Sequence, residues 1–496
     1  MASFFDGPDK CDDGEFRVIR YRDLLPNDHP VRLIERFVAD LDVSSFEARY
    51  KVGDGQKGRA PKDVRMMLSV ILYAVYRRTY SARQIDEATQ CQADFWFLTN
   101  GERISHDKIS DFITLHEDEV HRVFLETIYL AHENELLDFK GLYQDGYLLK
   151  ANASKKRSAT MQDLTHRERR LSDRLDAIID ELKDKQISPC QEEEKRRVCS
   201  KLSKLAALKA ALLEKIARRS GGKAPWKADI IASSTTINAT DPDSDKMKQK
   251  DGSYANSYLK VSAVDGKADI IVASAVDGYN DEPHMALPLF QQANENCKNT
   301  EDSYTTAIAD ANFTSAENCV EFEKQNIELI GPTRNYEEQK RNAEENAAND
   351  TMTYDETKHC VICPAGLELQ EKSRYFDSHK NTTLITFSNP TACLTCARRN
   401  ACVNGKTGYR QVKIDIRRPA QDRTLKRYLS EEGQSLYKRR SHTAETPQGD
   451  LKKNGRFIQL LRRGIRKTRV DSIYHDTVWN LRRIFNIKGA SLVWCA

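Results

Sequence analysis

The chain has 496 residues, of which 31% are charged and 39% hydrophobic, and its formal net charge is +4. This length allows about three domains of ordinary size, and the absence of any run of eighteen apolar residues excludes a membrane-spanning helix. The acidic start, MASFFDGPDKCDDGEF, lacks the apolar segment of a secretory signal, so we expect a cytoplasmic protein with no membrane partner.

Residues 1–140 are predicted to form an all-helical domain. Apolar residues recur at three-and-four spacing in PVRLIERFVADL, PKDVRMMLSVILYAVYRR and KISDFITLHEDEVHRVFLETIYLAHEN. Ser81 and Ser105 stand where helix N-caps belong. The short helices from Ser81 to about His116 suit either a helix-turn-helix that reads DNA or a plain helical core, and the sequence leaves both open.

Residues 141–160 are predicted to contain a buried strand, followed by a basic tail rich in small residues, within YQDGYLLKANASKKRSAT. We expect the strand to end at Asp145 and Gly146. A carboxylate at this place is costly to desolvate unless a cation meets it.

Residues 161–221 are predicted to form an antiparallel helical hairpin, broken at ISPC. Each helix carries an apolar seam, and the seam residues are Leu164, Leu171, Leu175, Ile178 and Leu182 in the first helix and Val198, Leu202, Leu205, Leu208, Leu212 and Ile216 in the second. Such a hairpin suits an arm or a dimer contact.

Residues 222–335 alternate between strand and helix patterns. SYLKVSAVD, DIIVASAV, TTAIAD and NIELIGPT are predicted strands, and HMALPLFQQANENC and SAENCVEFEKQ are predicted helices. Strands that alternate with helices indicate a sheet with crossover connections.

Two aspartates are predicted to form a metal site. Asp145 and Asp310 each follow a short apolar strand and precede small residues, and two neighbouring carboxylates repel one another unless a divalent metal lies between them. Glu445, within the basic segment that begins at Tyr437, is the candidate third ligand.

Residues 336–435 are polar, then rich in cysteine, then basic, and residues 436–496 are mainly helical. Five of the twelve cysteines fall in one window, and in a cytosolic chain this indicates metal rather than disulfides. Tetrahedral Zn²⁺ takes four ligands, and paired Cys-x2-Cys knuckles favour Cys360, Cys363, Cys393 and Cys396, with Cys402 as the fifth thiol.

Residues 403–470 contain 19 Lys and Arg against six Asp and Glu, a local charge of +13 that leaves about −9 for the rest of the chain. Aromatic and leucine residues lie between the cations, which favours a nucleic-acid partner over a merely solvated face. Arg462, Arg463 and Arg466 are the DNA-binding candidates of this segment.

Seven motifs together resemble one family: YQDGYLLKANAS, ATDPDSDKM, AIADANFTSAEN, CPAG, CLTCARRNAC, YKRRSHTAETPQGDLKKNGRFIQLLRRG and WNLRRI. The chain resembles bacterial insertion-sequence DDE transposases, most of all the group called the eleven-eighty-two family. The resemblance implies a mixed α+β or α/β fold. A helical N-terminal domain that binds DNA ends would precede an RNase H-like core, which is interrupted by the hairpin and by the cysteine-rich, zinc-binding insertion.

The resemblance also implies roles for individual residues. Asp145, Asp310 and Glu445 would be the catalytic triad and would hold two Mg²⁺ or Mn²⁺ ions. Arg440 and Lys452 would contact DNA, and Asn480 would pack the final helix. The zinc ligands implied by the CPAG motif are Cys363, Cys393, Cys396 and Cys402. The chain departs from the family at Asn312 and Phe313, in place of Gly-Tyr, and at Thr446, Pro447, Gln448 and Gly449, in place of Pro-x-Phe-Gly.

These expectations predict an enzyme that cuts the ends of an insertion sequence and joins them to target DNA, with no covalent protein intermediate. It would act in the bacterial cytoplasm at the nucleoid, as a homodimer on double-stranded DNA. One alternative is a DNA-binding protein derived from a transposase that no longer cuts. Another, a plain RNase H-like nuclease, is disfavoured by the helical N-terminal domain and the hairpin.

Overall fold

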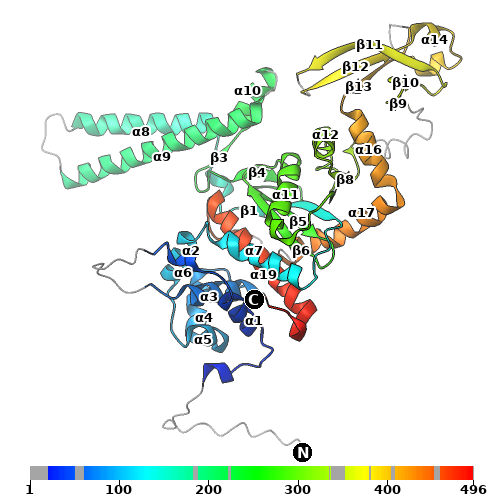
Figure 1. The fold of residues 1–496 in the computed structure, drawn as a ribbon. Coiled ribbons are helices and arrows are strands. Elements are labelled where there is room, and N and C mark those ends of the chain that lie inside the picture. The colour runs from blue at the N-terminus through cyan, green and yellow to red at the C-terminus, as the bar shows by residue number, and fades with distance from the viewer. Residues whose placement is uncertain are drawn as a thin grey trace, which may run out of the picture. The chain divides into compact units, whose positions relative to one another are not determined.

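The computed structural model describes residues 20–50, 61–181, 188–221, 225–334, 336, 352–378, 381–403, 408–451 and 459–494. Helices and strands are mixed, as the sequence predicts, and the N-terminal region is helical (Figure 1). The chain divides into two compact units, residues 1–126 with 485–496 and residues 127–484. Of the helices in the described residues, none combines the length and the apolar character needed to cross a bilayer.

The N-terminal unit is a cluster of short helices. It contains η1 (Tyr21–Asp23), α1 (Pro30–Ala39), α2 (Ser44–Glu47), α3 (Val64–Tyr76), α4 (Ala82–Cys91), α5 (Ala93–Thr99) and α6 (His106–Leu115). α3 is the central helix, because its buried residues lie on all of its sides. Ser81 and Ser105 are the N-cap residues of α4 and α6, as predicted, although neither side chain makes a capping hydrogen bond.

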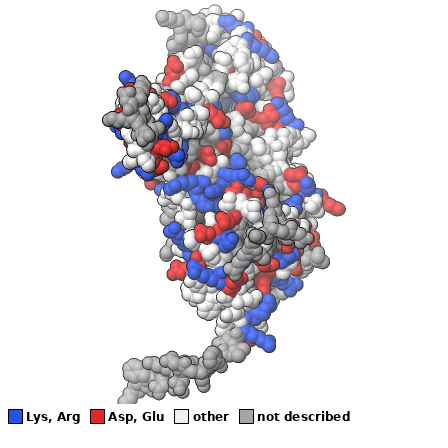
Figure 2. Space-filling model, turned by 90° about the vertical axis from the view of Figure 1, so that its left-hand side faces the viewer, with Lys and Arg blue, Asp and Glu red and all other residues white. Residues whose placement is uncertain are grey.

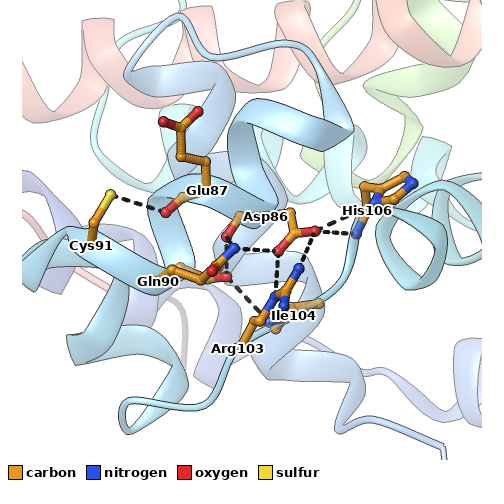
Figure 3. A network of polar contacts seen from close by, with 8 residues as sticks. Asp86, Glu87, Gln90, Cys91, Arg103, Ile104 and His106 are labelled. Atoms are coloured by element: carbon orange, nitrogen blue, oxygen red, sulfur yellow. Dashed lines mark hydrogen bonds and ion pairs between the residues drawn. The ribbon is translucent and has the colours of Figure 1, made fainter.

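A buried carboxylate of α4 is bonded to the start of α6 and to the residues just before it (Figure 3). Asp86 accepts hydrogen bonds from Arg103 Nε at 2.8 Å, from Gln90 Nε2 at 2.9 Å and from the His106 backbone N–H at 3.2 Å. The hydrogen bond from the Arg103 guanidinium holds the pKa of Asp86 well below its usual range. This network holds the start of α6 against α4, and the role of the segment as a DNA reader stays a prediction.

The second unit is built on a six-stranded mixed sheet. Its central strand β1 (Leu142–Lys150) is antiparallel to β5 (Tyr254–Asp265) and parallel to β7 (Thr306–Ile308), which pairs in parallel with β8 (Glu328–Ile330). β4 (Asp245–Lys248) and β6 (Ile270–Asp277) both pair with β5, β4 near its start and β6 near its end. The strands predicted for residues 222–335 all form.

Helices cover both faces of this sheet. α11 (Glu282–Asn296) packs on β1, β5 and β6, and α12 (Ala316–Lys324) packs beside α11. On the other face, Tyr143, Ile308 and Ile330 form a buried cluster with Ala444, against α16 (Arg418–Leu429) and α17 (Glu431–Thr443). α18 (Glu445–Gly449) follows α17 after the single residue Ala444. Glu445 therefore begins a helix of its own. We had expected it to lie inside one basic helix that begins at Tyr437, and that expectation was wrong.

The prediction that β1 ends at Asp145 and Gly146 was wrong. The strand continues to Lys150, because its antiparallel ladder with β5 extends from Leu142 to Lys150 and buries the residues beyond the acid. The apolar run YLL that follows Gly146 is thus part of the same strand.

The last long helix, α19 (Ile465–Lys488), is tied to the sheet at its start and in its middle. Asp241 accepts from the Gly464 N–H at 3.2 Å, and Asp243 from the Ile465 N–H at 2.9 Å. The buried Asn480 side chain donates to the Ile271 carbonyl at 2.8 Å and accepts from its N–H at 2.9 Å. Asn480 therefore packs the final helix, as the resemblance implies.

The predicted hairpin consists of α8 (Met161–Glu181) and α9 (Pro189–Ser220), and α10 (Pro225–Ser234) packs at its base. Ser188 and Gln191 form a capping box at the start of α9, where the sequence breaks at ISPC. Leu164, Ile178, Val198, Leu205 and Leu212 are buried in the seam, and Leu182 lies outside the described residues. A short ladder between β2 (Ser158–Ala159) and β3 (Ile237–Asn238) closes the base of the hairpin.

The cysteine-rich segment contains an antiparallel sheet that the sequence analysis missed. Its strands are β9 (Thr353–Asp355), β10 (Cys360–Ile362), β11 (Glu368–Asp377), β12 (Thr382–Ser388) and β13 (Gln411–Asp415). α14 (Pro390–Leu394) and α15 (Arg399–Cys402) follow β12. The buried apolar side chains of this sheet are Val361, Leu369, Ile385 and Phe387. These four side chains give the insertion an apolar core of its own.

Candidate active site

Asp145 and Asp310 lie at the same level on neighbouring strands. β1 and β7 pair at Leu142–Ala307 and Tyr143–Ile308, and this register, continued by two residues, brings Asp145 opposite Asp310. The ladder between the two strands stops at Tyr143, whereas β1 stays paired with β5 as far as Lys150. The two carboxylates therefore lie where parallel strands separate, which is where open sheets commonly bind ligands.

Asp145 is buried and held by two side chains that follow it by about 300 residues in the chain. Gln448 Nε2 donates to its Oδ2 atom at 2.7 Å, and Arg440 Nη1 lies 3.4 Å from its Oδ1 atom. Burial raises the pKa of the Asp145 carboxyl, the positive charge of Arg440 opposes that rise, and the negative charge of Asp310 adds to it. Arg440 is thus the cation that a buried acid at this position requires.

Asp310 belongs to the same cluster of charges. Its Oδ1 atom accepts the Asn312 backbone N–H at 2.8 Å, in the turn that follows β7. Its charge acts on Asp145 and raises the pKa of Arg440.

Glu445 reaches this cluster from the start of α18. Arg440 Nη2 lies 3.6 Å from its Oε1 atom, and 53% of the Glu445 side chain is exposed. One guanidinium therefore contacts both Asp145 and Glu445 and feels the charge of Asp310, so the structure gathers the three predicted acids around Arg440.

The oxygen donors of this cluster suit Mg²⁺, which prefers carboxylates and water. Among the described residues, no three His, Cys, Asp or Glu side chains are placed closely enough to hold a metal ion. In this arrangement the Arg440 guanidinium supplies the positive charge at Asp145 and Glu445. The approach of all three acids to within metal-bridging distance stays a prediction.

Family models match two stretches of the chain. One, described as "Transposase domain (DUF772)", matches residues 19–115, and another, described as "Transposase DDE domain", matches residues 362–485. The chain belongs to the insertion-sequence DDE transposases. A comparison with curated proteins finds no match. The DDE match includes Glu445 but begins after Asp145 and Asp310, so the case for these two residues depends on the strand geometry.

Membership of this family carries general properties. DDE transposases bind DNA, use divalent metal ions and belong to the enzymes that cut or transfer DNA strands. The acidic cluster beside β1 is the part of this transposase that suits such chemistry.

Four of the five clustered cysteines line one cavity. Cys363, Cys393, Cys396 and Cys402 surround a volume of about 30 Å³, which is enough for a water-sized occupant. Cys360 is fully buried in β10 and does not line this cavity. All five thiols are free in the structure. The cavity thus contains the four cysteines that the CPAG motif favours and excludes the fifth.

The predicted DNA-binding residues have different surroundings. Arg440 is mostly buried in the acidic cluster, Arg462 forms an ion pair with Asp471 at 2.6 Å, and Arg463 donates to the Asn152 carbonyl at 3.0 Å. Arg466 is exposed on α19, and Lys452 lies outside the described residues.

Much of the positive charge in residues 403–470 is used within the protein. Arg423 forms an ion pair with Glu323 at 2.7 Å, and Arg417 and Arg418 pair with nearby aspartates. On the face shown in Figure 2, Lys and Arg are interspersed with Asp and Glu. The local charge of the sequence therefore overstates the charge available to DNA in this transposase.

The sequence analysis missed three side chains of the acidic cluster. Gln448 donates to Asp145, and Asn312 Nδ2 donates to Glu282 Oε2 at 2.9 Å. Gln448 and Asn312 are positions at which the chain departs from the family pattern, and that departure was the available signal. Glu282 begins a helix whose pattern gave no indication that its first residue faces the two aspartates.

Proposed function

We propose that this transposase cuts the ends of an insertion sequence and transfers the freed 3′ ends to target DNA, with Asp145, Asp310 and Glu445 as the metal-binding acids of an RNase H-like core. The observation that carries the proposal is the level position of Asp145 and Asp310 on parallel strands, beside an arginine that also contacts Glu445. The strand order β6-β5-β1-β7-β8, in which only β5 runs opposite to the others, supports such a core.

The residues divide the work by position. Asp145 and Asp310 offer carboxylate oxygens where β1 and β7 separate, and Glu445 offers a more exposed one. When bound, a divalent metal would activate a water for attack on the phosphodiester and stabilise charge on the departing oxygen. Reactions of this kind depend on positioning and charge neutralisation and need no side-chain nucleophile.

Arg440 is suited to hold a phosphate at this site. Its Nε atom is buried and has no hydrogen-bond partner among the described residues, and a buried donor left unpaired costs free energy. A phosphate oxygen of the DNA end would satisfy this donor. Arg463 and Arg466 would add contacts farther along the DNA, and Lys452 keeps the role that the family resemblance implies.

Two further assignments belong to this proposal. The motifs support membership of the eleven-eighty-two group, and the joining of two DNA ends suits a homodimer. The cavity lined by Cys363, Cys393, Cys396 and Cys402 supports one structural Zn²⁺ per chain, which would brace the segment between β8 and α17.

The test is a cleavage and strand-transfer assay on a labelled element end with Mg²⁺ or Mn²⁺. We expect Asp145→Asn to abolish both steps while DNA affinity stays close to that of the wild type. Asp107→Asn, at an exposed position of α6, is the matched control and should remain active. Wild-type protein that binds the end but never cuts it would favour the alternative, a DNA-binding protein derived from a transposase.

A further inference from the structure

The helical hairpin has two flanks, which ion pairs between α8 and α9 identify. The two helices lie side by side (Figure 1). Arg174 pairs with Glu194 at 2.8 Å, and Lys209 pairs with Glu168 at 2.5 Å. Arg174 lies three residues after the seam residue Leu171 and Glu168 three residues before it, so the two ion pairs lie on opposite sides of the seam. Residues one, two or three turns away along each helix lie on the same side as these residues.

The flank of the Arg174–Glu194 pair carries cations from both helices. Six exposed Lys and Arg side chains share it: Arg167, Arg170 and Arg174 of α8, and Arg197, Lys201 and Lys204 of α9. A second copy of the chain would bring the same charges, and like charges across an interface repel one another. This flank therefore excludes a second copy.

The flank of the Glu168–Lys209 pair exposes two large apolar side chains. Leu213 lies one turn beyond Lys209 and is 58% exposed, and Ile179 lies three turns beyond Glu168 and is 40% exposed. The side chains between them on this flank are small, namely Ser172 of α8 and Cys199 and Ala206 of α9. Because the distance between packed helices depends on the side chains at the contact, small residues here let another helix approach closely.

Two charged residues complete this second flank. Arg169 and Asp176 lie one turn before and one turn after Ser172, and both are exposed. Neither has an ion-pair partner among the described residues. They are two turns apart on the same side of α8, about 10 Å at 1.5 Å per residue, so they do not pair with one another. Each is open to an opposite charge from another molecule.

The charge of the hairpin changes sign from its base to its far end. Residues 161–174 and 195–220 contain 13 Lys and Arg against four Asp and Glu, whereas residues 175–194 contain two Lys against seven Asp and Glu. Two hairpins that pair antiparallel would set the acidic end of each against the basic base of the other. Two parallel hairpins would set like charge against like.

The charged pair and the apolar pair indicate the same two-fold axis. In a two-fold pair, a contact of one residue with another is repeated in the opposite sense, so Arg169 meets Asp176 of the other copy when the axis passes beside Ser172. The apolar residues give the same level. Leu213 follows Leu212, which is in one buried cluster with Leu164, so it lies level with the start of α8.

Ile179 lies about 22 Å farther along α8 than Leu164, at 1.5 Å per residue. The point halfway between these two levels again falls beside Ser172. Single exposed apolar residues are normal in soluble proteins, and so are single exposed charges. Two independent pairings about one axis, on the flank that does not repel a second copy, are what point to a partner.

From these observations we infer that two copies of this transposase pair antiparallel through the Ser172 flank of the hairpin, with Arg169 of each copy against Asp176 of the other. The inference deepens the proposed function, on which it rests for the second copy, by naming the surface of the homodimer. It does not depend on the chemistry of the acids beside β1.

The test is the oligomeric state of the full-length protein without DNA, measured by sedimentation velocity over a range of concentrations. We expect the wild type to form a dimer. Arg169→Asp and Asp176→Arg should each weaken dimerisation at least about tenfold, because each places two pairs of like charges across the axis. Lys201→Glu, on the cationic flank, is the matched control: it changes the net charge as Arg169→Asp does and should dimerise as the wild type does.

Restoration separates a lost interface from a folding defect. A mixture of the Arg169→Asp and Asp176→Arg proteins should form dimers, because the charges across the axis are then opposite again, and the variant with both substitutions should dimerise by itself. Misfolded proteins would not recover on mixing. Single variants that dimerise as well as the wild type, or a mixture that stays monomeric, would overturn the inference.

DNA cleavage distinguishes this inference from the proposed function. Wild-type protein that is monomeric alone and dimeric only on DNA would refute the contact between hairpins and leave the proposed homodimer intact. Wild-type protein that dimerises through Arg169 and Asp176 but never cuts an element end would refute the proposed activity and support the contact.

Discussion

Two buried aspartates of the central strands differ in what surrounds them. Asp265, at the end of β5, accepts from the backbone N–H groups of Asp138, Phe139 and Lys267 and from the Tyr304 hydroxyl, at 2.8 to 3.2 Å. Asp145 has one amide donor and one guanidinium. The carboxylate with a full set of fixed donors is structural, and the one next to other acids is the candidate for chemistry.

The role of Asp265 predicts a loss of stability on amidation. Asp265→Asn replaces an acceptor oxygen with an NH₂ group that meets donors only, so we expect a loss of about 1–3 kcal/mol in the free energy of unfolding. Urea denaturation measures this loss. Asp251→Asn, at an exposed turn, should unfold as the wild type does, and an equal loss there would contradict the explanation.

Buried thiols give a prediction that depends on pH. Burial raises the pKa of Cys297 to about 12 and that of Cys319 to about 11. Because the thiolate is the reactive form, both side chains should stay protonated, and hence unmodified, at pH 8 and should ionise only as the pH approaches those values. Iodoacetamide followed by mass spectrometry should label the exposed Cys91, Cys190 and Cys199 first. Rapid labelling of Cys297 in the folded protein would show that its site opens.

The sequence predicts single residues of the site only where a local pattern marks them. Asp145 and Asp310 were chosen because the sequence pattern places each at the end of a short apolar strand, although Asp145 in fact lies within β1. Glu282 carries no such mark, because its proximity to them arises from the packing of α11 on β1, where its carboxylate lies against Gly146, 136 residues earlier in the chain. A contact of that kind depends on the whole fold and leaves no trace in residue spacing.

At the level of elements, periodicity succeeded where elements are long or apolar. The hairpin helices and the strands β5, β6 and β7 were predicted, whereas β9 to β13 were not. β11 shows the reason. Its seven consecutive residues from Gln370 to Phe376 are all exposed, so its sequence lacks the alternation of apolar and polar residues that predicts a strand. Because successive residues point to opposite faces, this stretch of β11 is exposed on both faces, so its polar sequence indicated a loop.

The contact between α19 and β6 gives a prediction at this scale. The Asn480 amide pairs with both the N–H and the carbonyl of Ile271, as another strand would. Asn480→Ala leaves both backbone groups unpaired in a buried place, so we expect a loss of about 1–3 kcal/mol for each unpaired group. Chemical denaturation measures the sum. Asn299→Ala, at an exposed position, is the control and should lose much less.

The cysteine cavity predicts which thiols hold the proposed zinc. Cys396→Ser should lose the metal and lower the Tm, whereas Cys360→Ser should keep the metal, since Cys360 lies outside the cavity. Metal analysis of the purified variants measures this, with about one zinc per wild-type chain as the reference. Loss of zinc in Cys360→Ser with retention in Cys402→Ser would identify a different set of four ligands.

For the whole molecule, the ion pairs decide which arginines remain for DNA. Arg463→Glu should weaken binding to DNA of any sequence and lower the salt dependence by about one counterion. Arg462→Glu should instead destabilise the protein, because it places a second acid beside Asp471. Fluorescence anisotropy at several salt concentrations measures the first effect, and thermal melting measures the second. Lys250→Glu, with the same change in net charge, is the control, and an equal effect there would mean that total charge alone governs binding.

The ladder of β2 and β3 has a consequence for how such proteins change over time. Only four residues, Ser158, Ala159, Ile237 and Asn238, join the strands at the base of the hairpin. Whole turns can therefore be gained or lost at the far end of α8 and α9 while the chain still enters and leaves the core at the same two points. The length of this arm is free to vary among descendants of one gene, so the reach of the arm can diverge while the acids beside β1 stay unchanged.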